Sequence, residues 1–154
     1  MQMIIRVFVA MSFRHEEEPA LIDYWHAMQR AASRAGGEFD LRRIEDLDGD
    51  YEIVERIYRE IEAADLVIAD LTMSPANVYL ELGYARGRGK PVIQTCREDT
   101  PLEFDVRGRR TLTYRNAASL EEKLLRHFNA LRGKLAPPDL SGQPDEGWSG
   151  ASSM

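Results

Sequence analysis

The sequence has little cysteine, little histidine and no long hydrophobic run. Its single cysteine, Cys96, cannot form an intrachain disulfide, and its three histidines, His15, His26 and His127, share no metal-ligand spacing. It also has no run of about 18 apolar residues and no charged-then-apolar leader. We therefore expect a soluble, cytoplasmic protein that needs no metal or other cofactor and has no membrane partner.

An excess of positive charge is also missing. Lys and Arg together number 20 against 26 for Asp and Glu, which gives a formal net charge of −6. Binding to duplex nucleic acid relies on concentrated Lys and Arg, so we expect no nucleic acid duplex as a partner. A small nucleoside or nucleotide remains compatible with this charge.

The length bounds the organisation of the chain. With 154 residues, of which 44% are hydrophobic, the chain can bury one hydrophobic core and is too short to form two domains that each bury a sizeable core. From Ala136 the composition changes to Pro, Gly, Ser and Asp, which cannot bury enough surface to order a segment. We predict one domain over residues 1–135 and a flexible tail over residues 136–154.

Short apolar runs alternate with amphipathic segments along the domain. Strands are predicted at residues 4–10, 39–44, 66–69, 91–95 and 111–114, with helices at residues 19–35, 53–61, 77–86 and 119–131. Residues 46–50 are predicted to be a capping turn and residues 96–109 a loop. The alternation predicts an α/β, flavodoxin-like (Rossmann-like) three-layer sandwich with a five-stranded parallel sheet of order 2-1-3-4-5. A ligand is then expected where the first and third strands end side by side.

The sequence predicts two carboxylates near the ends of these strands. Asp70 directly follows the strand at residues 66–69, and Glu81 falls in the first turn or so of the helix that begins near Asn77. Each has a structural alternative, because helix termini also favour such residues. Glu81 could be an acid favoured by the helix macrodipole, and Asp70 and Asn77 could be helix caps.

Charged runs elsewhere have simpler interpretations. The acidic run at residues 16–18 is predicted to be solvated. Ser119 is followed three residues later by Glu122, and this spacing is a capping-box pattern that predicts the start of the last helix. The basic cluster at residues 107–110 is predicted to be an exposed loop, with contact to a phosphate or a neighbouring subunit as the alternative.

Three segments carry a resemblance to a known group. They are VFVAMSFR at residues 7–14, ADLVIADLT with NVYLELGYARGRGKPVI inside residues 64–93, and FDVRGRRTLTYRN at residues 104–116. Together they resemble the nucleoside 2-deoxyribosyltransferase-like superfamily, including its nucleotide N-glycosidase branch and the related TIR-like nucleotide-binding proteins. The third segment is more similar to the TIR-like branch.

The resemblance implies roles for individual residues. Glu81, which precedes Leu-Gly, corresponds to a nucleophile that attacks the anomeric carbon and expels the base, as the carboxylate of a retaining glycosidase does. Asp70 would assist as a second acid or hold the ribose hydroxyls. Some relatives keep a further Asp where this chain has Ile57, and an expected glycine is replaced by Met11. The substrate-binding candidates are Ser12, Phe13, Arg14, Ser74 and Asn77.

The resemblance therefore implies an N-glycosidase or 2-deoxyribosyltransferase that acts on a nucleoside or nucleotide. Two alternatives stay open, a TIR-like module that binds a nucleotide without turnover and an NAD hydrolase. The family also suggests a homodimer or a larger homo-oligomer.

Overall fold

Strand and helix alternate through the whole described region. The computed structural model describes residues 3–44, 51–132 and 134. Its strands are β1 (Ile5–Ala10), β2 (Phe39–Arg42), β3 (Leu66–Asp70), β4 (Val92–Arg97) and β5 (Thr111–Tyr114). Its helices are α1 (Ala20–Arg34), α2 (Tyr51–Ala63), α3 (Ala76–Gly87), α4 (Phe104–Arg107) and α5 (Ala117–Leu131).

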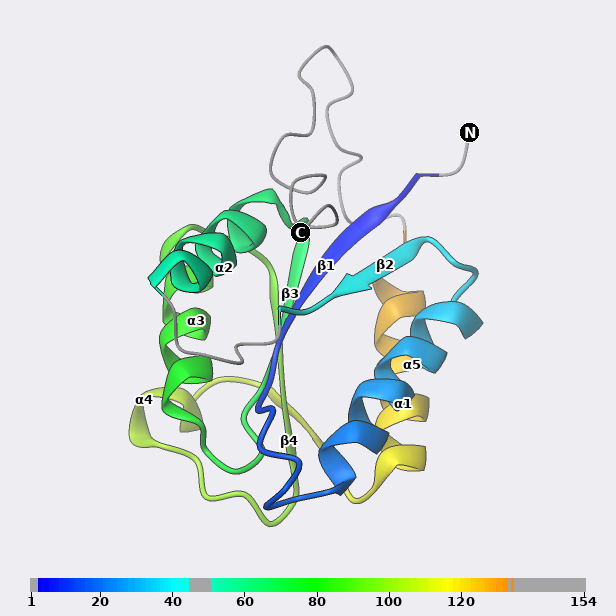
Figure 1. Cartoon of the computed structure of the whole chain (residues 1–154). Helices are drawn as coiled ribbons and strands as arrows, with labels where there is room; N and C mark the ends of the chain where they lie inside the picture. The colour runs from blue at the N-terminus through cyan, green and yellow to red at the C-terminus, as the bar shows by residue number, and fades with distance from the viewer. Residues whose placement is uncertain (1–2, 45–50, 133, 135–154) are drawn as a thin grey trace.

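The five strands form one parallel sheet of order β2-β1-β3-β4-β5 (Figure 1). This order confirms the predicted topology. β1 and β3 are neighbours in register, with Val9 opposite Ile68 and Ala10 opposite Ala69. The connection from β1 leads toward β2 and that from β3 leads toward β4, so the chain diverges in opposite directions where these two strands end. Open parallel sheets bind ligands at such a point.

Helices cover both faces of the sheet (Figure 1). α1 and α5 pack together on one face, and α2 and α3 pack together on the other. Strand alternation divides β1 between the two cores: Val7 and Val9 belong to the core under α1 and α5, whereas Phe8 and Ala10 belong to the core under α2 and α3. The apolar run that predicted β1 is thus buried on both sides.

Two local predictions need correction. Residues 96–109 are not all loop, because β4 continues to Arg97 and one helical turn forms at α4. That turn is held by Val106, which is 7% exposed and packs into the core under α2 and α3. Four residues are too few to produce a helical period in a sequence.

The start of α5 also differs from its predicted position. Asn116 is the N-cap, and its side chain and that of Ser119 form the reciprocal pair of a capping box. The helix therefore begins two residues before Ser119. Glu122 makes an ion pair with Arg34 of α1 instead of completing a cap, at 2.6 Å.

Some of the remaining predictions about individual elements are confirmed, and others concern residues outside the described ranges. β2 is an edge strand as predicted, although it ends at Arg42, and α1 ends before Gly36 and Gly37, both of which have positive φ. The turn predicted at residues 46–50 and the tail at residues 136–154 lie outside the described residues. Within the described residues, no helix combines the length and apolar character that a bilayer crossing needs.

Candidate functional site

A small cavity lies beside the carboxyl end of β1, on the face covered by α2 and α3. We call it the Glu81 cavity; its volume is about 80 Å³. The end of β1 and residues 11 and 13 form one wall, α2 and Ile44 contribute a second, and α3 contributes Asn77, Leu80 and Glu81. It therefore sits at the divergence between β1 and β3, where the topology predicts a ligand.

Glu81 is the one carboxylate among the described residues that line this cavity. It is 8% exposed and is the sixth residue of α3, one residue later than predicted because the helix begins at Ala76. Its surroundings are mostly apolar, and they include Met11 and Ile57, which are 1% and 7% exposed. A carboxylate in such a place is costly to bury unless it has partners or a function.

Asn77 belongs to the same cavity. The N-cap of α3 is Pro75, whose backbone is extended, and no side chain makes a capping hydrogen bond there. Asn77 is the second residue of the helix, beyond the capping position, so the structure does not support the cap interpretation. Its amide lines the cavity four residues before Glu81, on the same side of α3.

Asp70 takes a different position. It is fully buried, and it accepts hydrogen bonds from the Thr72 backbone N–H at 3.1 Å, from Thr95 Oγ1 at 2.6 Å and from the Tyr114 hydroxyl at 2.8 Å. Thr72 Oγ1 in turn lies 2.9 Å from the Tyr114 hydroxyl and accepts from the Arg97 backbone N–H. These contacts tie together the ends of β3, β4 and β5, and Asp70 does not line the Glu81 cavity.

Burial dominates the electrostatics of this network. It raises the pKa of Asp70, while the hydrogen bonds from Thr95, Thr72 and Tyr114 act in the opposite direction. Burial and the Asp70 carboxylate raise the pKa of the Tyr114 hydroxyl. Burial likewise raises the pKa of the Cys96 thiol to about 11, so this cysteine is a protonated core residue at neutral pH.

The loop candidates Ser12, Arg14 and Ser74 lie at the same sheet edge but outside the cavity wall. Ser12 is 3% exposed, and its Oγ accepts from the backbone N–H of Arg14. Arg14 is exposed and donates to the Met73 carbonyl at 3.4 Å, which links the loops after β1 and β3. Ser74 Oγ donates to the Pro101 carbonyl at 2.8 Å. Of the loop candidates, only Phe13 lines the cavity.

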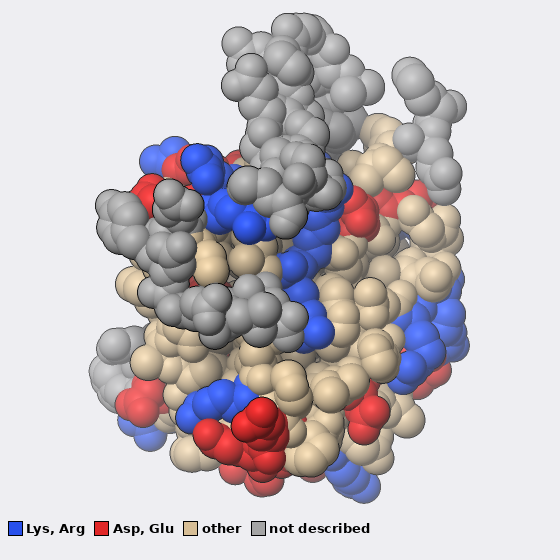
Figure 2. Space-filling model, viewed as in Figure 1, with Lys and Arg blue, Asp and Glu red and all other residues tan. Residues whose placement is uncertain are grey.

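Arg43 was not singled out from the sequence. Its guanidinium lies 4.7 Å from the ring centroid of Phe13 and 4.5 Å from that of Trp25, and it donates to Met11 Sδ. Because Phe13 and Met11 are cavity residues, these stacked contacts hold Arg43 beside the Glu81 cavity. Figure 2 shows a band of Lys and Arg side chains on the face where β1 and β2 lie. The signal available in the sequence was only a pair of arginines, Arg42 and Arg43, within the segment predicted as an edge strand.

Glu18 also departs from its predicted solvated state. It makes an ion pair with Arg97 at 2.9 Å, and this contact lowers the pKa of Glu18. Arg97 additionally donates to Asp99 at 2.7 Å and to the Tyr24 hydroxyl at 3.1 Å. Arg97 thereby joins the loops that follow β1 and β4, at the edge of the sheet that carries the Glu81 cavity.

The residues that the structure describes contain no group of three or more His, Cys, Asp or Glu side chains placed to hold a metal ion. The chemistry available in the Glu81 cavity is therefore that of one carboxylate, one amide and three aromatic side chains, Phe8, Phe13 and Tyr58.

Comparison with known proteins gives one family match. The profile described as nucleoside 2-deoxyribosyltransferase matches residues 16–137, a range that contains Asp70 and Glu81 but begins after Arg14. A comparison with curated protein sequences gave no match.

Solved structures share the fold. The CMP N-glycosidase of Clostridium botulinum is 20% identical with a TM-score of 0.56, covering 77% of this chain and 97% of its own. The 2-desoxiribosyltransferase of Leishmania mexicana is 18% identical with a TM-score of 0.57, covering 80% and 98%. The 2-deoxyribosyltransferase of Bacillus psychrosaccharolyticus is 16% identical with a TM-score of 0.56, covering 75% and 90%. At these identities the likeness shows the fold.

Proposed function

Because the chain belongs to the nucleoside 2-deoxyribosyltransferase family, we propose that it cleaves the N-glycosidic bond of a nucleoside or nucleotide with Glu81 as the nucleophile. The observation that carries this proposal is the position of Glu81. Its carboxylate belongs to a mostly apolar cavity at the divergence between β1 and β3, and it is the one acid among the described lining residues.

The proposed reaction has two steps. A carboxylate oxygen of Glu81 attacks the anomeric carbon, the carbon–nitrogen bond breaks, and the base leaves with the bonding electron pair and takes up a proton. Water or a second base then attacks the anomeric carbon of the glycosyl ester and releases Glu81. Water yields a free sugar, and a second base yields a new nucleoside.

The substrate is proposed to place its sugar next to Glu81. The cavity volume of about 80 Å³ is well below the roughly 300–1,000 Å³ of typical ligand sites, so it accommodates only part of a nucleoside. Asn77, Phe13 and Tyr58 are among the polar and aromatic neighbours of that part. Arg43 is placed to meet a phosphate, because a guanidinium fixed on aromatic rings keeps its N–H groups oriented.

Asp70 is assigned a positioning role. Its oxygens already accept three hydrogen bonds, and it does not line the Glu81 cavity. It holds the carboxyl end of β3, from which the chain continues into α3 and Glu81.

A second candidate function is cleavage of a pyridinium nucleotide such as NAD. The described lining residues include no second carboxylate to protonate a leaving base, and Ile57 occupies the side of the cavity formed by α2. Nicotinamide leaves a pyridinium nucleotide as a neutral molecule and needs no proton. The apolar lining therefore suits this leaving group better than a purine or pyrimidine that must be protonated.

The test is incubation of the protein with ribonucleosides, deoxynucleosides, their monophosphates and NAD, followed by chromatography of the released base. We expect release from at least one class, and Glu81→Gln should slow it by about a thousandfold or more. Glu55→Gln is the matched control, because Glu55 is an exposed acid of α2 that does not line the cavity. A 2-fluoro nucleoside should leave a glycosyl adduct that peptide mass spectrometry locates on Glu81.

Each outcome separates the candidates. Release that Glu81→Gln leaves unchanged would contradict the assigned nucleophile. Tight nucleotide binding with no release from any substrate would favour a binding module without turnover. Release of nicotinamide alone would favour the second candidate.

A further inference from the structure

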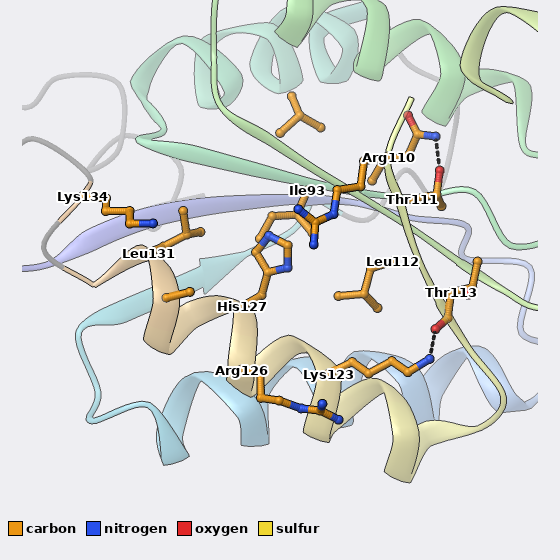
Figure 3. A pocket seen from close by; sticks show the side chains of 13 residues that line it. Ile93, Arg110, Thr111, Leu112, Thr113, Lys123, Arg126, His127, Leu131 and Lys134 are labelled. Carbon is orange, nitrogen blue, oxygen red and sulfur yellow. Dashed lines mark hydrogen bonds between the residues drawn. The ribbon is translucent and has the colours of Figure 1, made fainter. Parts of the chain in front are cut away.

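A larger cavity lies along β5, the edge strand farthest from β2. It is bounded by β5, the first residues of β4, and α5, and we call it the β5 cleft (Figure 3). Its volume is about 600 Å³, which is within the range of small-molecule sites. The β5 cleft and the Glu81 cavity share no lining residue. The β5 cleft is therefore a separate site that the proposed reaction does not use.

The charge of the β5 cleft is of one sign. Arg110 precedes β5, Lys123 and Arg126 come from α5, Lys134 follows α5, and the described lining residues include no Asp or Glu. Arg110, Arg126 and Lys134 make no ion pair within the described part of the chain, although Asp and Glu outnumber Lys and Arg in the sequence. A group of unpaired cations in a chain of net charge −6 is a local arrangement that attracts an anion.

His127 lies inside this group. Its imidazole and the Arg110 guanidinium approach each other from α5 and from the start of β5 (Figure 3). Burial and the positive charge of Arg110 lower the pKa of His127, and the other charged residues that line the cleft, Lys123, Arg126 and Lys134, are cations as well. An anion placed between Arg110 and His127 would relieve this repulsion.

The remaining lining suits an organic group. Ile93, Leu112 and Leu131 supply apolar surface, and the hydroxyl of Thr111 accepts from Gln94 Nε2 at 2.8 Å. Lys123 Nζ donates to the Thr113 carbonyl at 2.6 Å, which holds this ammonium along β5. The β5 cleft thus offers cations together with apolar area, whereas a bare inorganic ion would need only the cations.

We propose that the β5 cleft is a second binding site, for a phosphate monoester with an organic body of nucleotide size. The phosphate is held between Arg110 and His127, with Lys123 as a further cation along β5, and the organic body lies against Ile93, Leu112 and Leu131. Arg110 is the principal phosphate ligand, because a guanidinium can bind two phosphate oxygens at once.

The experiment measures equilibrium binding of AMP, CMP and inorganic phosphate to the full chain by calorimetry at low salt. The Glu81→Gln background prevents turnover, and Arg110 and Lys123 line only the β5 cleft, so failure of the proposed function does not affect the comparison of their variants. Arg110→Gln and Lys123→Gln should each weaken nucleotide binding about tenfold. Arg115→Gln, an exposed arginine outside both cavities, should leave it unchanged.

A site-specific readout comes from His127. The chain has three histidines, so His127→Gln identifies the His127 imidazole signal by NMR. A nucleotide bound in the β5 cleft should raise the pKa of this imidazole and leave the NMR signals of His15 and His26 unmoved. An unchanged His127 pKa at nucleotide saturation would overturn the proposal.

Three further results would overturn it. Inorganic phosphate binding as tightly as AMP would show an adventitious ion only. Nucleotide binding that Arg110→Gln and Lys123→Gln both leave unchanged would place the nucleotide outside the β5 cleft. A homodimer that Arg110→Gln dissociates, with no nucleotide bound by wild type, would assign it to a second copy of the chain.

Discussion

Tyr114→Phe tests whether the Asp70 network holds the carboxyl edge of the sheet together. The substitution removes one hydroxyl that donates to Asp70 Oδ2 at 2.8 Å and lies 2.9 Å from Thr72 Oγ1. The aromatic ring remains and can keep its edge contact with Tyr24, at a centroid distance of 5.0 Å. The change therefore isolates the hydrogen bond from ring packing.

The magnitude follows from what each partner retains. Asp70 Oδ2 keeps the hydrogen bond from Thr95, and Thr72 Oγ1 keeps that from the Arg97 backbone, so both oxygens stay hydrogen-bonded although the Thr72 hydroxyl loses the Tyr114 oxygen as its acceptor. The loss is then that of one buried hydrogen bond to a carboxylate, about 2 kcal/mol of the free energy of unfolding. For a chain of this length that corresponds to a fall in Tm of roughly 4–8 °C.

Urea unfolding followed by circular dichroism measures this loss, with Tyr84→Phe as the matched control. The Tyr84 hydroxyl donates to Glu62 at the surface, so its removal should cost much less than that of the Tyr114 hydroxyl. A Tyr114→Phe protein within about 0.5 kcal/mol of wild type would refute the reasoning, because the buried hydroxyl would then contribute no more than an exposed one.

Two further predictions concern charged groups at the same edge. Arg97→Met should reduce the free energy of unfolding by about 1–2 kcal/mol, and by less at high salt, because it removes three side-chain hydrogen bonds of a half-buried guanidinium. The control Arg115→Met removes an exposed ion pair and should change this free energy little. Equal losses for the two variants in urea unfolding would contradict the prediction. Asp70→Asn should alter the pH dependence of the free energy of unfolding. Burial raises the pKa of Asp70 above its ordinary value of 3.8, so the native state binds this proton more tightly than the unfolded state does. Wild type should therefore lose stability relative to the variant as pH rises from about 4 through the pKa of Asp70 in the folded state. A wild-type advantage that grows as pH rises to about 4 and then stays constant up to about pH 8 would show the opposite shift.

The fold was predictable because its signals are local. The buried run at residues 66–69, the glycines after α1 and the period of α2 each depend on a few neighbouring residues. The failures involve contacts between distant segments. α4 forms where Val106 reaches the core, and Glu122 was read as part of a cap because its partner Arg34 lies on another helix.

The location of the candidate site could be predicted from the sequence, but the full set of residues that form it could not. The topology locates the ends of β1 and β3 together, and Phe13, Asn77 and Glu81 do line one cavity there. Arg43 could not be found from local sequence, because its position depends on rings contributed by the loop after β1 and by α1.

The separation of Asp70 from Glu81 follows from the alternation of side chains along β3. Ala69 and Leu71 belong to the core under α2 and α3, so Asp70, which lies between them, faces the side of the sheet that carries α1 and α5. Its contact with Tyr114, a residue of that second core, agrees with this orientation. Glu81 lies on α3, across the sheet. A second acid for the Glu81 cavity would therefore have to come from the α2 side, where Ile57 stands, and Asp70→Asn should change stability more than the rate constant of the chemical step.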